Sequence, residues 1–240
     1  MRLDLHLVDK GVFESRARAQ AAIKSGCVTV DGRIERKPSA AISSDMSIKA
    51  AAPHPYVSRG GVKLAHALSH WNVDVANAVC LDLGASTGGF TEVLLMNGAA
   101  KVYAVDVGRG QLHEKLRGDA RVISLEGVHA KDLSRDLAPD AVDVIVCDVS
   151  FISLRKALPQ ALVLAAPGAW LVALVKPQFE VGPGRIGKGG LVKGATDDVP
   201  VEIGRWLEDE AGWSVIGVCD SPIVGGDGNR EHLIAARTQI

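Results

Sequence analysis

The stretch LDLGASTGGF, residues 81–90, decides the fold of this chain. An apolar run leads into it, which predicts a strand over Val79–Leu83 followed at the glycines by a helix over Gly89–Asn97. The glycines permit a tight turn and a close approach of the backbone to a ligand. Their spacing is neither G-x-G-x-x-G nor a phosphate-binding loop, since no Lys-Ser/Thr pair follows. On its own, the turn fits a plain strand-to-helix connection as well as a ligand site.

Strand-like and helix-like segments alternate on the carboxyl side of this turn. The expected strands are Lys101–Asp106, Val122–Leu125, Val142–Asp148, Trp170–Lys176, Ser214–Asp220 and His232–Arg237. The expected helices are Gln111–Arg117, Leu154–Leu164 and Pro200–Glu210. Such alternation predicts an α/β fold with a doubly wound, parallel sheet that binds ligands at the carboxyl ends of its strands.

Asp106 ends the second expected strand, about 20 residues after the glycine turn. A carboxylate at this place can accept hydrogen bonds from both ribose hydroxyls of an adenosine. Enzymes that use NAD and enzymes that use S-adenosylmethionine (SAM) share this geometry. A looser glycine turn suits SAM, because SAM has no pyrophosphate that needs the amide groups of a helix N-terminus.

Four charged residues fall where the expected topology brings strand ends together. Asp148 and Lys176 end two expected strands that are adjacent in a doubly wound sheet. Lys63 precedes the first strand, and Glu231 precedes the last. Each residue alone is compatible with a solvated strand end or a turn cap, but two of them beside the ligand crevice favour a functional site.

Composition excludes several classes of protein. The 240 residues are 47% hydrophobic and 23% charged, as in globular proteins, and the net charge is −1. The four cysteines form no CxxC pair and the histidines show no HExxH spacing, so we expect no metal site and no disulfide scaffold. The N-terminus lacks a signal-peptide core, and prolines interrupt the apolar residues 157–175. We therefore expect a soluble cytoplasmic protein.

Charge is distributed unevenly along the chain. Residues 1–60 hold ten basic and six acidic side chains, a net charge of +4, whereas the remainder holds seventeen and twenty-two, a net charge of −5. A basic module on a mildly acidic body is typical of a polyanion-binding appendage. On charge alone, a basic surface without a partner is an equally good interpretation.

The pattern within this basic segment is more specific. Ser15 is a suitable N-cap for a helix over Arg16–Lys24, and a short strand over Cys27–Val30 runs into the turn dipeptide Asp31-Gly32. This string resembles the S4 RNA-binding domain over residues 2 to about 49. The resemblance implies that structured RNA is bound by the following residues: Arg2, Arg16, Arg18 and Lys24. We expect an α+β S4-like domain over residues 1–49, a Pro-rich linker over 50–56 and a second domain over 57–240.

The second domain resembles the FtsJ-like ribose 2′-O-methyltransferases, and the whole chain resembles the TlyA (hemolysin A) family of rRNA methyltransferases. The motifs that carry this resemblance are SRGGVKL, LDLGASTGGF, VYAVDVG, CDVSFISL, LVKPQFEVG, IGKGGLVK and GNREHL. It implies methyl transfer from SAM to a ribose 2′-hydroxyl, with cytidines of rRNA as the target. The implied catalytic tetrad is Lys63, Asp148, Lys176 and Glu231. The implied cofactor-binding residues are Asp82, Gly84, Ser86, Thr87, Gly88, Gly89, Phe90 and Asp106.

Within this tetrad we expect Lys176 to act as the general base, with Lys63 stabilising the developing alkoxide. We also expect Arg59, and a Gly-rich lid over residues 181–194 that carries Arg185 and Lys188, to contact RNA. One segment departs from the family pattern, because His129 and Lys131 stand where Asn and Arg are usual. We therefore assign no adenine contacts there.

Three other functions are compatible with parts of the sequence. An NAD(P) oxidoreductase on the same fold is disfavoured by the glycine spacing. A membrane-active hemolysin is disfavoured because no membrane span or strongly basic amphipathic helix is present. An RNA-binding ribosome assembly factor without catalysis is disfavoured because all four tetrad residues are present.

Overall fold

The structure is a computed structural model that describes residues 1–239. It divides into two compact units, Met1–Pro55 and a larger one that begins at Tyr56. The expected linker at 50–56 is shortened at both ends. Ala50 belongs to a strand of the first unit, and Tyr56 packs against the core of the second.

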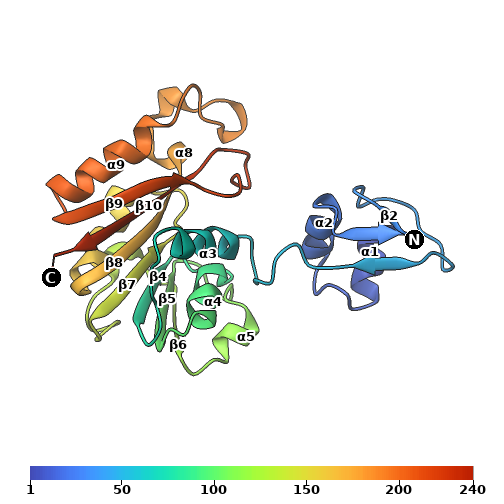
Figure 1. Cartoon of the computed structure of the whole chain (residues 1–240), viewed down its shortest axis with the longest axis horizontal. Coiled ribbons are helices and arrows are strands. Elements are labelled where there is room, and N and C mark those ends of the chain that lie inside the picture. The colour runs from blue at the N-terminus through green and yellow to red at the C-terminus, as the bar shows by residue number, and fades with distance from the viewer. Residues whose placement is uncertain (240) are drawn as a thin grey trace. The chain divides into compact units, whose positions relative to one another are not determined.

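The small unit is an α+β fold (Figure 1). It has a hydrophobic core of its own. Helices α1 (Leu3–Asp9) and α2 (Arg16–Lys24) pack on a three-stranded antiparallel sheet of order β2-β1-β3. Its strands are β1 (Val28–Val30), β2 (Arg33–Ile34) and β3 (Ile48–Ala50). The expected cap is confirmed, since the Ser15 hydroxyl accepts a hydrogen bond from the Arg18 amide. Asp31 and Gly32 both have positive φ, as a tight hairpin turn requires.

The large unit is built on a seven-stranded sheet of order β6-β5-β4-β7-β8-β10-β9. Its strands are β4 (Val79–Leu83), β5 (Lys101–Asp106), β6 (Val122–Glu126), β7 (Val142–Cys147), β8 (Ala165–Val175), β9 (Trp213–Asp220) and β10 (His232–Thr238). The chain reverses its strand order beside β4, which places the turn after β4 at a topological switch point.

The expectation of an all-parallel sheet is wrong at one edge. The first five strands are parallel, but β10 runs antiparallel to both β8 and β9. The physical reason is connection length: β9 and β10 are joined by a loop with no helix to carry the chain back across the sheet. Because β10 is antiparallel to β8, the start of β10 lies beside the end of β8, at the carboxyl edge of the parallel strands.

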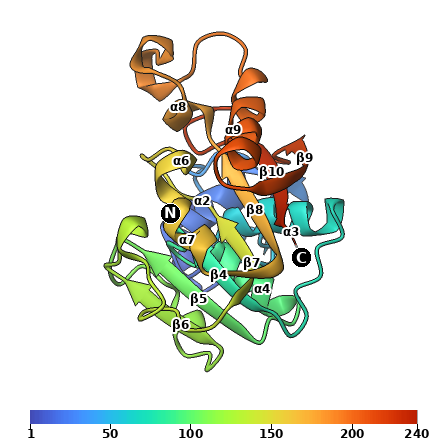
Figure 2. The ribbon, with the colours of Figure 1, turned by 90° about the vertical axis from the view of Figure 1, so that its left-hand side faces the viewer.

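Helices lie on both faces of this sheet (Figure 2). One face carries α3 (Gly60–His70), α4 (Gly89–Met96) and α5 (Glu114–Arg117). The other carries α6 (Leu154–Ala157), α7 (Pro159–Val163) and α9 (Asp198–Asp209), and α8 (Pro177–Glu180) follows β8 directly. No helix within residues 1–239 has both the length and the apolar character needed to cross a bilayer.

Several element boundaries differ from those expected. The helix expected over Leu154–Leu164 is broken into α6 and α7 at Pro159, which lacks an amide hydrogen and begins a new helix. Only the last turn of Gln111–Arg117 is helical, because the amides of residues 110–112 donate to Glu126 instead. The strand expected from Trp170 begins at Ala165.

Candidate active site

The glycine turn after β4 has the backbone geometry that its composition indicates. Gly84, Ser86 and Gly88 all have positive φ, between +47° and +95°. A Cβ on Gly84 would lie 2.7 Å from the carbonyl oxygen of Asp148, so only glycine lets this turn meet the loop after β7. The turn therefore brings the ends of β4 and β7 into contact at the carboxyl edge of the sheet.

A pocket of about 400 Å³ opens at this edge. Its size is in the range of sites for small organic ligands and cofactors. Its lining includes glycine-turn residues, the start of α3 and the ends of β7 and β8. The lining residues are Ser58, Arg59, Gly60, Lys63, Gly84, Ala85, Ser86, Thr87, Gly89, Phe90, Asp148, Ser150 and Lys176.

Two lysine–carboxylate pairs lie at this pocket, one buried and one partly buried. Lys63 Nζ, on the first turn of α3, donates to Glu231 Oε2 at 2.5 Å, and both side chains are less than a tenth exposed. Lys176 Nζ lies 2.7 Å from Asp148 Oδ1 and donates to Ser150 Oγ at 2.8 Å. The structure thus brings together all four residues of the expected tetrad, but as two ion pairs.

The topology explains how four distant residues meet. Parallel strands β7 and β8 are neighbours, so Asp148 and Lys176 emerge at the same sheet edge. Antiparallel β10 pairs His232 with Val175, which places Glu231 opposite Lys176 in register. The Lys63 side chain reaches Glu231 from helix α3. The antiparallel direction of β10, which the sequence did not predict, therefore brings the fourth residue to this edge.

Five of the eight expected cofactor residues line the pocket, whereas Asp82, Gly88 and Asp106 are not among its lining residues. Gly84, Ser86, Thr87, Gly89 and Phe90 line the pocket. Asp106 ends β5, and its two carboxylate oxygens accept hydrogen bonds from the amides of Ser86 and Gly108 at 2.8 and 2.7 Å. Asp106 thus fixes the glycine turn, and each oxygen keeps a lone pair for a further donor.

Asp82 is fully buried and does not line the pocket. Its Oδ2 accepts a hydrogen bond from the Thr91 hydroxyl at 2.6 Å, while Oδ1 has no partner within residues 1–239. Burial raises the pKa of this carboxyl to about 7, although the bond from Thr91 opposes the shift. In this structure Asp82 joins β4 to α4, the helix that opens at the glycines.

The segment after Asp148 holds a feature that sequence reasoning missed. Phe151 has a φ of +66°, which is uncommon for a bulky residue, and its side chain is 90% exposed. Its ring lies 5.1 Å from that of Phe179. The two serines nearby have separate roles, since Ser150 binds Lys176 whereas Ser153 caps α6. No sequence signal marks an exposed phenylalanine with left-handed backbone.

The expected RNA-binding residues of the small unit are largely paired. Arg2 and Arg16 each lie 2.9 Å from the carboxylate of Asp4, which is fully buried and also accepts from Gln20 at 2.7 Å. The guanidinium of Arg2, followed by these other donors, holds the pKa of Asp4 well below its usual range.

The remaining candidates for RNA contact differ in their exposure and in whether they form ion pairs. Arg18 forms an exposed pair with Glu14 at 3.0 Å, and Lys24 is exposed on the last turn of α2. In the large unit, Arg59 lines the pocket and Lys188 is exposed. Arg185 pairs with Asp198 at 2.8 Å and also donates to the Ala195 carbonyl. Residues 183–190 form two short 3-10 turns, so the expected lid has local structure of its own.

Comparison with known proteins agrees with this arrangement. A model of FtsJ-like methyltransferases matches residues 56–238, and a model of the S4 domain matches residues 1–48. The 16S/23S rRNA (cytidine-2′-O)-methyltransferase TlyA of Mycobacterium tuberculosis is 43% identical over 99% of this chain and 90% of its own length. Hemolysin A of Brachyspira hyodysenteriae is 41% identical over 97% of this chain and 98% of its own.

A solved structure is similar over the full length. It is described as "Putative hemolysin from Streptococcus thermophilus", is 39% identical in sequence and superposes with a TM-score of 0.76. The match covers 100% of this chain and 88% of that one. The similarity therefore extends over both units, and not over the methyltransferase unit alone.

Proposed function

This chain belongs to the FtsJ-like methyltransferase family, and we propose that it transfers a methyl group from SAM to a ribose 2′-hydroxyl of ribosomal RNA. The observation that carries the proposal is the presence of two ion pairs, the buried Lys63–Glu231 and the partly buried Lys176–Asp148, at one pocket beside the glycine turn. Buried charges are costly to a fold, so two such pairs in one place favour a chemical role over a structural one.

The residues at the pocket fit SAM. The positive-φ turn leaves room where a Cβ would meet the backbone of Asp148, and Asp106 retains acceptor capacity for ribose hydroxyls. Ser86 and Thr87, which belong to this turn, also line the pocket. SAM supplies a methyl group activated by a sulfonium, and Asp148 would place a negative charge near it.

The tetrad can prepare a ribose hydroxyl for attack. Lys176 Nζ is held by Asp148 and Ser150, and once neutral it would accept the hydroxyl proton as the oxygen forms its bond to the methyl carbon. Lys63, kept in place by Glu231, would stabilise the negative charge that develops on that oxygen. Positioning of the hydroxyl in line with the methyl group would supply much of the remaining rate.

Ribosomal RNA is the substrate that the relatives' names favour. The mycobacterial relative is named for 2′-O-methylation of cytidine in 16S and 23S rRNA, and the small unit matches the S4 domain. We propose cytidine in rRNA for this chain also. The exposed Phe151 ring, next to pocket-lining Ser150, would offer a flat surface to a nucleotide that enters the pocket.

The test is methyl incorporation from labelled SAM into three substrates: small ribosomal subunits, large subunits and naked rRNA. The proposal predicts label in at least one of them, at a cytidine whose 3′ linkage becomes resistant to alkali, because a 2′-O-methyl group removes the attacking hydroxyl. Label on a base, with every linkage still cleavable, would contradict ribose methylation. No label despite measurable SAM binding would favour an RNA-binding assembly factor.

A further inference from the structure

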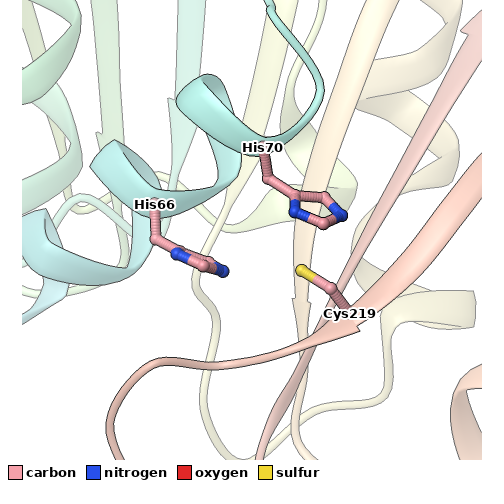
Figure 3. Close-up of side chains that lie close together, drawn as sticks. All are labelled: His66, His70 and Cys219. Carbon is pink, nitrogen blue, oxygen red and sulfur yellow. The ribbon is translucent and has the colours of Figure 1, made fainter.

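Two histidines and a cysteine gather on the large unit, outside the pocket. His66 and His70 lie one turn apart on α3, and Cys219 lies near the end of β9. One possible ligand atom of each residue lies within 4.8 Å of those of the other two. Figure 3 shows both imidazole rings and the thiol directed into one space between the helix and the strand.

An irregularity in the sheet places Cys219 on this face. In the pairing of β10 with β9, Ala235 faces Gly217 but Ala236 faces Val215, so Ile216 is an extra residue. Side chains alternate along a strand, and one extra residue moves all later ones to the opposite face. Val215 accordingly packs into the core under α9, whereas Cys219 packs into the core under α3.

The three side chains are not engaged elsewhere. Across residues 1–239 the His66 and His70 rings make no hydrogen bond or ion pair, and neither does the Cys219 thiol. The rings contact each other at a centroid distance of 5.8 Å, and His70 also contacts Trp71 at 5.0 Å. The nearby carboxylate of Asp220 is bound by Arg230 and His232. Within the described part of the chain, the cluster therefore presents three donors that take part in no hydrogen bond or ion pair.

We propose that His66, His70 and Cys219 bind one Zn²⁺ ion, with water as the fourth ligand. Two imidazole nitrogens and one thiolate are a donor set that zinc prefers over Mg²⁺ or Ca²⁺. Tetrahedral zinc with bonds of about 2.0–2.3 Å places its ligand atoms about 3.5 Å apart, so side-chain rotation is enough to close the present spacing. His70 is exposed, which leaves the fourth position open to water.

Binding would join two elements that lie beside the tetrad. Helix α3 carries Lys63, and β9 is paired with β10, which Glu231 precedes. An ion that bridges α3 and β9 therefore links the two elements that position the Lys63–Glu231 pair. Because zinc would bind the folded chain, it should also raise the melting temperature. Binding requires the loss of the thiol proton, which passes to the buffer.

The test is titration of untagged, metal-free full-length protein with ZnCl₂ against a chromophoric chelator. We expect one equivalent bound and a rise in melting temperature. His70→Gln and Cys219→Ser should each weaken affinity by about 100-fold or more, because loss of a direct ligand costs at least as much as loss of a residue that only orients a ligand. Matched controls are His129→Gln and Cys27→Ser, which remove an imidazole and a thiol outside the cluster and should bind as the wild type does.

Cobalt provides a second readout that is independent of folding stability. Co²⁺ added to the wild type should give a thiolate-to-metal charge-transfer band, which Cys219→Ser should abolish and Cys27→Ser should keep. The proposal is overturned if the wild type binds no zinc at micromolar concentration. It is also overturned if the cluster variants bind zinc as tightly as the controls.

Discussion

At the scale of single residues, the site is defined by charges that the fold buries in pairs. Lys63 and Glu231 are 7% and 3% exposed, and each is the partner of the other. Removal of one member leaves the other charge buried without compensation, whereas removal of both does not. The Lys176–Asp148 pair is more open, because the Asp148 side chain is 20% exposed. The closed pair should therefore contribute to stability in a way that a mutant cycle can detect.

We predict that Lys63→Met and Glu231→Gln each lower the free energy of unfolding by about 3–5 kcal/mol. The double variant should be closer to the wild type than the sum of the two single losses, because no unpaired charge remains. Urea denaturation of the four proteins measures the coupling. Strict additivity of the two losses would show that the pair is not an energetic unit.

A second prediction concerns Asp82 and the dependence of stability on pH. The pKa of this carboxyl is about 7 in the folded chain against 3.8 when unperturbed. Between these values the folded state holds a proton that the unfolded state has lost, so stability falls as pH rises through this window. The loss is complete above about pH 7 and amounts to at most about 4 kcal/mol.

Asp82→Asn should remove this loss while it keeps an acceptor for the Thr91 hydroxyl. The variant should therefore be more stable than the wild type at pH 8, with little difference near pH 4, where the wild-type carboxyl is protonated in the fold. Chemical denaturation at the two pH values checks this. An equal gain at both values would mean that ionisation of Asp82 is not the cause.

At the scale of elements, the sequence predicted those parts of the site that follow parallel strands. The turn after β4, the acid that ends β5 and the charges after β7 and β8 could all be placed, because strand ends meet at one edge. The direction of β10 could not be predicted, since periodicity carries no information about strand direction. The break at Pro159 was readable in principle, because proline rarely continues a helix.

Side-chain partners were the least predictable feature. The pairing of Arg16 with Asp4 depends on how α1 and α2 pack, whereas the resemblance to the S4 domain implied that Arg2 and Arg16 contact RNA. The left-handed backbone of Phe151 and the bulge at Ile216 likewise depend on tertiary contacts. His66 and His70 of the proposed zinc site share α3, but Cys219 comes from β9, far away in the sequence, and its place beside them depends on the fold.

The glycine turn gives a prediction at this scale. Gly84→Ala should lower stability by about 1–3 kcal/mol and weaken SAM binding, because φ is +89° and the new Cβ would lie 2.7 Å from the Asp148 carbonyl. Gly118→Ala is the matched control, since φ there is −84° and the nearest atom is 3.6 Å away. Thermal melts of both variants measure the change in stability, and calorimetry with SAM measures the change in affinity. If the two variants behave alike, the close approach at Gly84 does not matter.

At the scale of the whole molecule, the chain forms two units, each with its own hydrophobic core or cores. The large unit holds the pocket and the tetrad, and the small unit carries the excess of basic residues. Part of that excess neutralises the buried Asp4, which leaves Arg18 and Lys24 as the cations of α2 that do not contact this carboxylate. Binding of RNA and binding of cofactor should therefore be separable by substitution.

We predict that Arg18→Glu combined with Lys24→Glu weakens affinity for the RNA substrate about 10-fold or more and reduces its salt dependence, because phosphate contacts release counterions. Affinity for SAM should not change. The control is Lys156→Glu combined with Arg205→Glu, which makes the same change of charge at two exposed side chains of the large unit. This double variant should weaken RNA affinity less. Equal losses in both double variants would assign the effect to net charge alone.

The most direct test of the central claim is a comparison of Lys176→Ala with the wild type in single turnover on the methyl-accepting RNA. We predict that the variant binds SAM and RNA normally but forms the alkali-resistant ribose linkage about 10²–10⁴-fold more slowly, as expected for loss of a general base. Lys156→Ala, which removes an exposed lysine of α6, should react at the wild-type rate. A Lys176→Ala variant that methylates ribose as fast as the wild type would contradict the account.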